Sequence, residues 1–104
     1  MDDTVAEKLN ELMALCARHR VRRLALFGSA VTGGFDPERS DLDFAVEFEM
    51  MPPKEHADAY FGLLEDLEQL FEGMRIDLIE YGPIRNPYFR RELDQTQVLL
   101  YQAA

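Results

Sequence analysis

Cysteine is almost absent from the sequence, since Cys16 is the only one. A single cysteine excludes an intrachain disulfide, so we expect a fold suited to a reducing compartment and a cytoplasmic protein. Cys16 falls on the apolar side of an expected helix, where a buried thiol contributes to packing rather than to nucleophilic chemistry. The sequence therefore predicts a structural cysteine.

Long apolar runs are also absent. No segment approaches the roughly 20 apolar residues that a membrane-spanning helix needs, so no membrane partner is expected. The opening residues, MDDTVAEKLNELM, are acidic and amphipathic and do not show the basic-then-apolar pattern of a signal peptide. The sequence therefore predicts neither insertion nor export.

Basic residues are scarce, with 11 lysines and arginines against 20 aspartates and glutamates and a formal charge of −9. Proteins that grip nucleic acids draw most of their affinity from basic surface, so long DNA or RNA is not an expected partner. The arginines nevertheless gather in two groups, at 18–23 and 85–91. This distribution favours a protein partner or a small anionic ligand.

What is present is enough apolar material for one folded domain, because 47% of the 104 residues are hydrophobic. We expect a single domain over 1–104. Apolar spacings of three and four predict helices, strict alternation predicts strands, and Gly and Pro mark the turns. The expected α/β (α+β) order is α-β-(turn)-β-α-β-α. Helices are predicted at about 4–19, 54–71 and 88–101, strands at about 24–27, 42–48 and 76–79, and a short helix at 29–32.

The most informative segment is 26–48, LFGSAVTGGFDPERSDLDFAVEF. Gly28 and Ser29 follow an apolar run, where a small turn can bring backbone N–H groups close to a phosphate. Asp41 and Asp43 lie two positions apart in an expected strand, so their side chains point to the same face. Two carboxylates at that separation repel each other unless a cation lies between them. The segment therefore predicts a site for a metal-bound nucleotide.

Asp77 lies in the middle of the last expected strand, between apolar neighbours. If that strand lies beside the strand of Asp41 and Asp43, three hard oxygen ligands suited to Mg²⁺ share one face. In a two-metal arrangement, Asp41 and Asp43 bridge both ions and Asp77 binds the ion beside the nucleophile. The alternative for Asp77 is a structural ion pair with Arg75 or Arg85.

These residues together resemble the signature of the DNA polymerase β-like nucleotidyltransferases. The matching elements are Phe27-Gly28-Ser29, the run 41–44 (Asp-Leu-Asp-Phe) and the later Asp77. The short chain is similar to the minimal nucleotidyltransferases, the MNT family that includes MntA-like antitoxins. The similarity spans essentially the whole chain, including its closing segment 84–101.

The resemblance implies a small mixed β-sheet flanked by helices. It also implies transfer of a nucleoside monophosphate, AMP from ATP, to a hydroxyl group, with two Mg²⁺ ions for which Mn²⁺ substitutes. Gly28 and Ser29 are then expected to bind the triphosphate. Many such proteins act as antitoxins of a HEPN-domain toxin, some by attaching AMP to a toxin tyrosine, so a HEPN-domain protein is the expected partner.

One departure from the family pattern concerns the residues after Gly28-Ser29. Many minimal members carry arginines where this chain has Ala30 and Thr32, and these arginines would steady the triphosphate. Arg39, with Ser40 beside it before Asp41, is the expected substitute for nucleotide binding. The departure leaves open a second function, that of a catalytically weak or inactive antitoxin or adaptor that neutralises its partner by binding. Transfer to a small hydroxylated molecule is a third function.

Aromatic residues near the last expected helix have three open interpretations. Tyr81, Tyr88 and Phe89 lie close in sequence to Arg85 and Arg90. They suit a nucleobase pocket or a partner surface, but packing at the start of the helix is favoured.

Overall fold

Four strands form one mixed sheet in the computed structural model, which describes residues 3–32 and 41–103. The strand order is β3-β2-β1-β4. β1 runs antiparallel to both β2 and β4, whereas β2 and β3 are parallel. The strands are β1 (Val21–Phe27), β2 (Asp41–Phe48), β3 (Arg75–Glu80) and β4 (Val98–Gln102).

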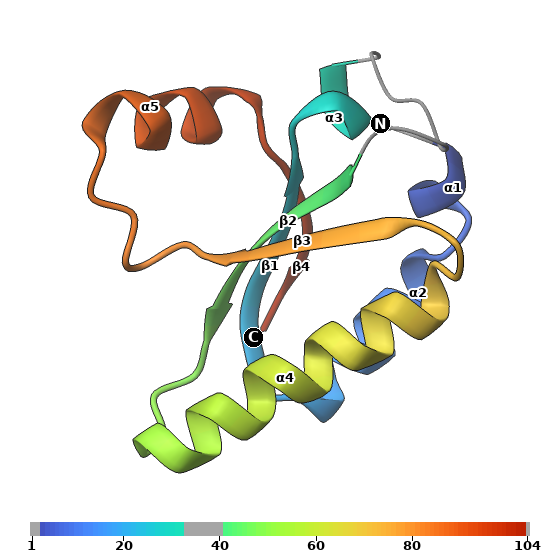
Figure 1. Ribbon diagram of the computed structural model, residues 1–104, viewed down its shortest axis with the longest axis vertical. Coiled ribbons are helices and arrows are strands. Elements are labelled where there is room, and N and C mark those ends of the chain that lie inside the picture. The colour runs from blue at the N-terminus through green and yellow to red at the C-terminus, as the bar shows by residue number, and fades with distance from the viewer. Residues whose placement is uncertain (1–2, 33–40, 104) are drawn as a thin grey trace.

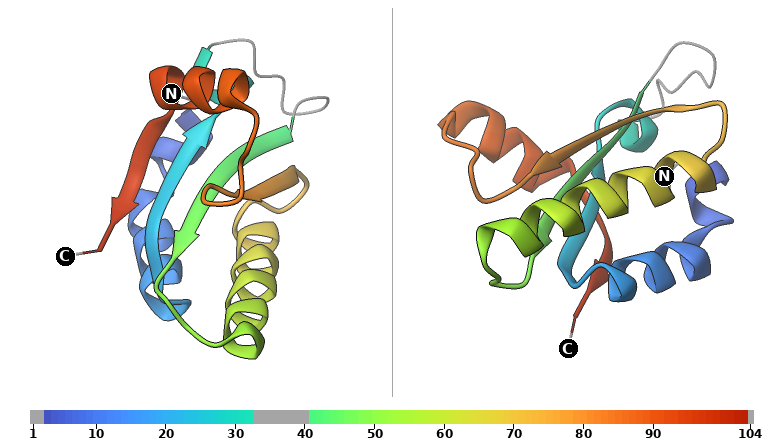
Figure 2. Two further views of the ribbon diagram at one scale, coloured as in Figure 1. Left: turned by 90° about the vertical axis from the view of Figure 1, so that its left-hand side faces the viewer. Right: turned by 60° about the horizontal axis from the view of Figure 1, so that its bottom comes forward.

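The helices lie on both faces of this sheet (Figures 1 and 2). α2 and α4 lie on one face and α5 lies on the other, as the right-hand view of Figure 2 shows. α4 is the crossover that a parallel pair of strands requires between β2 and β3. None of the described helices is long and apolar enough to cross a membrane. The helices are α1 (Asp3–Ala6), α2 (Leu9–Arg18), α3 (Ser29–Thr32), α4 (Pro53–Leu70) and α5 (Pro87–Thr96).

The main core lies between the sheet and the α2–α4 layer. Alternate residues of the strands point into it, including Leu26 of β1 and Phe44 of β2, both fully buried. The opposite face is lined by small residues, since Ala25 and Ala45 are buried there without belonging to the main core. Only one sheet face therefore carries a thick apolar layer, which leaves the other face available for polar side chains.

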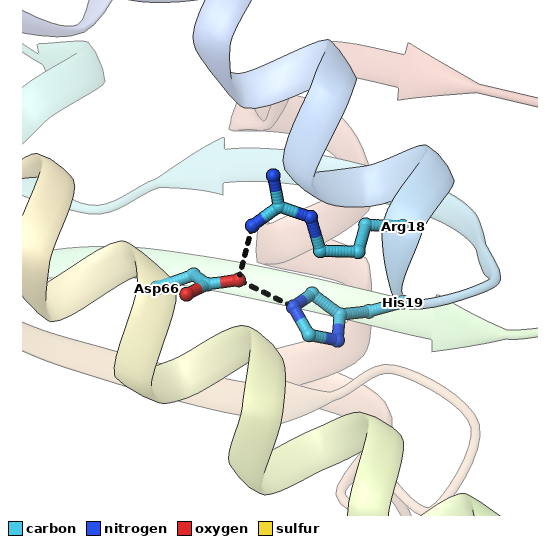
Figure 3. A network of polar contacts seen from close by, with 3 residues as sticks. All are labelled: Arg18, His19 and Asp66. Atoms are coloured by element: carbon cyan, nitrogen blue, oxygen red, sulfur yellow. Dashed lines mark hydrogen bonds and ion pairs between the residues drawn. The ribbon is translucent and has the colours of Figure 1, made fainter.

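A polar cluster joins the end of α2 to the middle of α4 (Figure 3). Nε2 of His19 lies 2.5 Å from Oδ2 of Asp66, and Nη1 of Arg18 donates to the same oxygen at 3.3 Å. The imidazole lies against Gly62, where an added Cβ would stand only 2.7 Å from Cε1 of His19. Gly62 therefore gives the His19 ring the space it needs to reach Asp66.

The C-terminal prediction was wrong, because the last helix ends at Thr96 and the chain then forms β4. The segment from Val98 pairs with the edge of β1 that β2 leaves free, with Tyr101 opposite Leu24. Backbone hydrogen bonding along that edge outweighs the helical spacing read from the sequence. The first predicted helix is also divided in two, at Glu7 and Lys8.

Candidate active site

Two of the predicted aspartates lie in one row across the sheet. The parallel register places Asp43 of β2 opposite Asp77 of β3, and the antiparallel register places Phe27 of β1 opposite Asp43. Side chains that are paired across neighbouring strands point to the same face. Phe27, Asp43 and Asp77 therefore form a row, here called the Asp43 row, on the face opposite the main core. Asp41 precedes Asp43 by two residues and shares this face.

The carboxyl group of Asp43 is electrostatically unfavourable when it is charged. The pKa of Asp43 is raised to about 6, first by burial, then by the charges of Asp77 and Asp41, and last by a hydrogen bond with the Asp77 side chain. Each of these causes favours the protonated form. A cation at this position would reverse the balance, so the Asp43 row has the chemistry of a cation site.

Asp41 has a different environment, because a basic residue lies next to it. Nε of Arg75 lies 2.9 Å from Oδ1 of Asp41, and the register places these two residues opposite each other. The contact is an ion pair without hydrogen-bond alignment, since this enclosed oxygen makes no hydrogen bond. Sequence reasoning missed this pair. Its signal was the equal offset of Asp41 from Asp43 and of Arg75 from Asp77, which makes them opposite neighbours in parallel strands.

Gly28 forms the turn beside Asp43. Its φ of +72° is in the left-handed region, and a Cβ there would lie 2.3 Å from Oδ2 of Asp43. Glycine is therefore required twice, by the backbone conformation and by the nearby carboxylate. The chain then enters α3 at Ser29, as predicted, and the N–H of Val31 donates to the Gly28 carbonyl at 3.0 Å. The predicted phosphate-binding turn and the Asp43 row are thus adjacent.

The residues that depart from the family pattern, Ala30 and Thr32, lie in α3. Ala30 is buried and belongs to the main core, so this position serves packing and does not face a ligand. The backbone of Thr32 ends α3. Arg39 and Ser40, predicted to bind the nucleotide, lie outside the described residues, and their roles stay predictions.

The carboxylates of Asp41, Asp43 and Asp77 are the candidate ligands of Mg²⁺. Within residues 3–32 and 41–103, no three His, Cys, Asp or Glu side chains are already arranged to hold a metal ion. One observation favours a cation all the same: burial and the charges of Asp77 and Asp41 oppose the ionisation of Asp43. Carboxylate oxygens are the ligands that Mg²⁺ prefers. The three carboxylates are therefore the kind of ligand that Mg²⁺ takes, while Oδ1 of Asp41 is paired with Arg75 in this structure.

Comparison with known proteins identifies the fold family. The family model for the nucleotidyltransferase domain matches residues 10–98. The chain belongs to the nucleotidyltransferase family. Two proteins of Methanocaldococcus jannaschii, each named "Putative protein adenylyltransferase", are similar to this nucleotidyltransferase. They are 35% and 32% identical over 78 residues, which is 75% of this chain and 75% and 74% of theirs. The prediction of a nucleotidyltransferase enzyme is confirmed.

Solved structures confirm the predicted fold of this nucleotidyltransferase. A "putative minimal nucleotidyltransferase" is 31% identical with a TM-score of 0.67, and the match covers 94% of this chain and 95% of the other. A toxin–antitoxin structure with AMP-PNP has a TM-score of 0.68 at 18% identity, covering 91% of this chain and 73% of the other. The latter likeness concerns the fold alone. The mixed sheet flanked by helices and the resemblance to minimal nucleotidyltransferases are thereby confirmed.

Proposed function

We propose that this nucleotidyltransferase is a Mg²⁺-dependent protein adenylyltransferase, which transfers AMP from ATP to a hydroxyl group of a partner protein. The observation that carries the proposal is the pairing of Asp43 with Asp77 beside the Gly28 turn. The names of the two M. jannaschii relatives support a protein as acceptor.

The chemistry assigns a role to each part of the site. Gly28 and Ser29 bind the triphosphate, because the absence of a side chain at Gly28 lets the phosphates approach the backbone and Asp43. Asp41, Asp43 and Asp77 would hold Mg²⁺, and the bound ion would neutralise phosphate charge and lower the pKa of the attacking hydroxyl. The acceptor oxygen forms a bond to the α-phosphorus, the bond to the bridging oxygen breaks, and pyrophosphate leaves. Asp77 accepts the hydroxyl proton.

The proposed acceptor is a tyrosine of a HEPN-domain toxin, with this chain as the antitoxin. Its support is the resemblance of the 27–44 motif to minimal nucleotidyltransferases. The alternative is neutralisation by binding alone, and the burial of Ala30, where many minimal members carry an arginine, favours that alternative.

Transfer of label from ATP to the partner tests the proposal. The wild type and the variants Asp43→Asn and Asp77→Asn are incubated with α-labelled ATP, Mg²⁺ and the purified HEPN-domain protein. We expect loss of at least about 100-fold in label transfer for both variants, because each removes a charged ligand. Asp58→Asn is the control, since Asp58 is an exposed acid on α4.

Two outcomes decide between the candidates. Equal label transfer by wild type and Asp43→Asn would show that the Asp43 row is not catalytic. If Asp43→Asn transfers no label but neutralises the toxin as well as wild type does, binding alone accounts for the antitoxin role.

A further inference from the structure

A groove lies between the end of β1 and the inner side of α5. It has a volume of about 360 Å³ and is lined by Phe27, Gly28, Phe89, Glu92, Leu93 and Thr96. The four lining residues from α5 are spaced as one helical stripe, at i, i+3, i+4 and i+7. Figure 2 shows α5 on the sheet face opposite α2 and α4. The groove, here called the α5 groove, therefore opens on the same face as the Asp43 row.

The α5 groove begins next to Asp43. Phe27 lines the groove and is the neighbour of Asp43 in the row, and adjacent strands are about 4.8 Å apart. Gly28 lines the groove too and lies against the Asp43 carboxylate. A nucleotide whose phosphates lie at Gly28 thus has its nucleoside end within reach of the groove. Asp77 lies at the other end of the row, away from the groove.

We infer that the α5 groove is the nucleobase pocket and that it takes a purine with an exocyclic amino group, recognised by Glu92. This inference rests on the proposed function, because it assumes that a nucleoside triphosphate binds at Gly28. Among the aromatic residues near this helix, it assigns the nucleobase pocket to Phe89, the one of the three that lines the groove.

Two aromatic rings form the apolar surface of the groove. Phe27 and Phe89 have ring centroids 6.1 Å apart and planes tilted by 53°. Leu93 is buried beneath them, whereas Phe89 remains 40% exposed. An exposed ring beside an open groove offers a flat face on which a base can stack. The two fused rings of a purine cover more of that face than a pyrimidine does.

The polar side chains of the groove can only accept hydrogen bonds. The hydroxyl of Thr96 donates its proton to the Glu92 carbonyl at 2.8 Å. The Glu92 carboxylate has no donor of its own, and within residues 3–32 and 41–103 it makes no hydrogen bond or ion pair. Glu92 is exposed, so water donates to its carboxylate in the free protein, and an amino group on the base would replace that water as the donor. The 6-amino group of adenine and the 2-amino group of guanine share this chemistry.

The α5 wall of the groove is held in place before any ligand binds. The Asn86 side chain caps the helix by accepting from the N–H groups of Tyr88 and Phe89, at 2.9 and 3.2 Å. Tyr81 ties the helix to the sheet: its hydroxyl donates to Asp94, and the Arg90 guanidinium lies 4.3 Å from its ring centroid. A preformed wall lowers the entropic cost of binding.

Calorimetric titration with two matched nucleotide pairs tests the inference. ATP is compared with purine riboside 5′-triphosphate, which lacks only the 6-amino group, and GTP with ITP, which lacks only the 2-amino group. All titrations include Mg²⁺. In one pair, we expect the wild type to bind the amino-bearing nucleotide about 10-fold more tightly, because the carboxylate gains a charge-assisted hydrogen bond. The pair that shows the difference identifies adenine or guanine.

Variants of the groove complete the experiment. Glu92→Ala is expected to abolish the preference, so that both nucleotides of the pair bind with the same affinity. Phe89→Ala is expected to weaken all four nucleotides about 10-fold through lost stacking. Phe61→Ala is the matched control, since Phe61 is a 65% exposed phenylalanine on α4. Melting temperatures of all variants establish that they are folded.

The outcomes separate this inference from the proposed function. If the wild type binds none of the nucleotides, both fail. If nucleotides bind but Glu92→Ala and Phe89→Ala match the wild type, the groove inference is overturned while the proposed function stands. The same holds if the wild type binds nucleotides without any preference for an amino group.

Discussion

Asp66 and Asp43 lie on opposite faces of the same sheet, and their surroundings shift their pKa values in opposite directions. The pKa of Asp66 is lowered, first by its hydrogen bond with His19 and then by the charges of His19 and Arg18, which outweigh the effect of burial. The pKa of Asp43 is raised to about 6, by burial and by the neighbouring carboxylates. Ionisation of Asp66 therefore stabilises the fold, whereas ionisation of Asp43 destabilises it.

The two carboxylates differ in the charges that surround them. Asp66 has two basic side chains as partners, Arg18 and His19, and Gly62 makes room for the imidazole. Asp43 has carboxylates as neighbours, and Gly28 lies so close to its Oδ2 that a side chain there would clash with it. A charge arrangement that costs stability is retained where it serves binding, which is typical of active sites. Substitutions at and beside these two aspartates should therefore change the free energy of unfolding by different amounts and with different signs.

Replacing Gly28 by alanine should have the largest effect. The variant Gly28→Ala places a Cβ against Asp43 and strains a left-handed backbone, so we expect a loss of about 3 kcal/mol in the free energy of unfolding. Urea denaturation measures it. The double variant with Asp43→Ala should recover part of the loss, because the clashing oxygen is removed. Full additivity of the two substitutions would contradict the contact.

Removing the charge of Asp66 should destabilise the protein. Asp66→Asn weakens the hydrogen bond to the half-buried His19, and we expect a loss of about 1.5 kcal/mol at pH 7. The measurement is urea denaturation beside Asp58→Asn, an exposed acid on the same helix that should change little. A loss no greater than that of the control would mean that the cluster is only a surface contact.

Removing the charge of Asp43 should increase the free energy of unfolding, in contrast to the same change at Asp66. Asp43→Asn relieves repulsion from Asp77, so without divalent cations we expect a gain of about 1 kcal/mol at pH 7, after allowance for solvent screening of a partly exposed group. The same urea measurement in EDTA checks it. Added Mg²⁺ should raise the stability of the wild type and leave that of the variant nearly unchanged. A variant less stable than wild type in EDTA contradicts the repulsion.

The stability differences of Asp43→Asn and Asp66→Asn from the wild type should depend on pH in different ranges. The folded-state pKa of Asp43 is raised, so its penalty is absent below about pH 4 and develops as pH rises through about 6. The advantage of Asp43→Asn should therefore vanish on acidification from pH 7 to pH 4. The folded-state pKa of Asp66 is lowered, so its contribution persists until pH falls below about 4. Stability curves of both variants against wild type measure the two windows.

Local signals in the sequence predicted much of the fold. The alternation in 42–48 and the Pro52-Pro53 break predicted β2 and α4 close to their observed bounds. β4 had no local signal that distinguished it from a helix, because its strand conformation depends on the free edge of β1. The strand conformation of β4 thus depends on a contact with a segment far away in the sequence, and the local sequence does not predict that contact.

The sequence predicted which residues belong to the candidate site, but not the contacts that these residues make with other elements. Spacing alone indicated that Asp41 and Asp43 share a face. The placement of Asp77 beside them depended on the two strands being neighbours, and the register places Asp77 opposite Asp43. The ion pair of Arg75 with Asp41 and the contact of His19 with Asp66 join residues 34 and 47 positions apart, and both depend on how elements pack. Sequence patterns describe one element at a time, so contacts between elements appear only in the structure.

The place of β3 at the end of the sheet order has a kinetic consequence for the proposed reaction. Within residues 3–32 and 41–103, the strand of Asp77 has a neighbour on one side only, so the acceptor side of the Asp43 row ends at the border of the sheet. A hydroxyl group on the surface of a large folded partner can then be delivered by collision, without first entering an enclosed chamber. With a formal charge of −9 on this chain, encounters with a basic partner would be accelerated at low ionic strength and slowed by added salt.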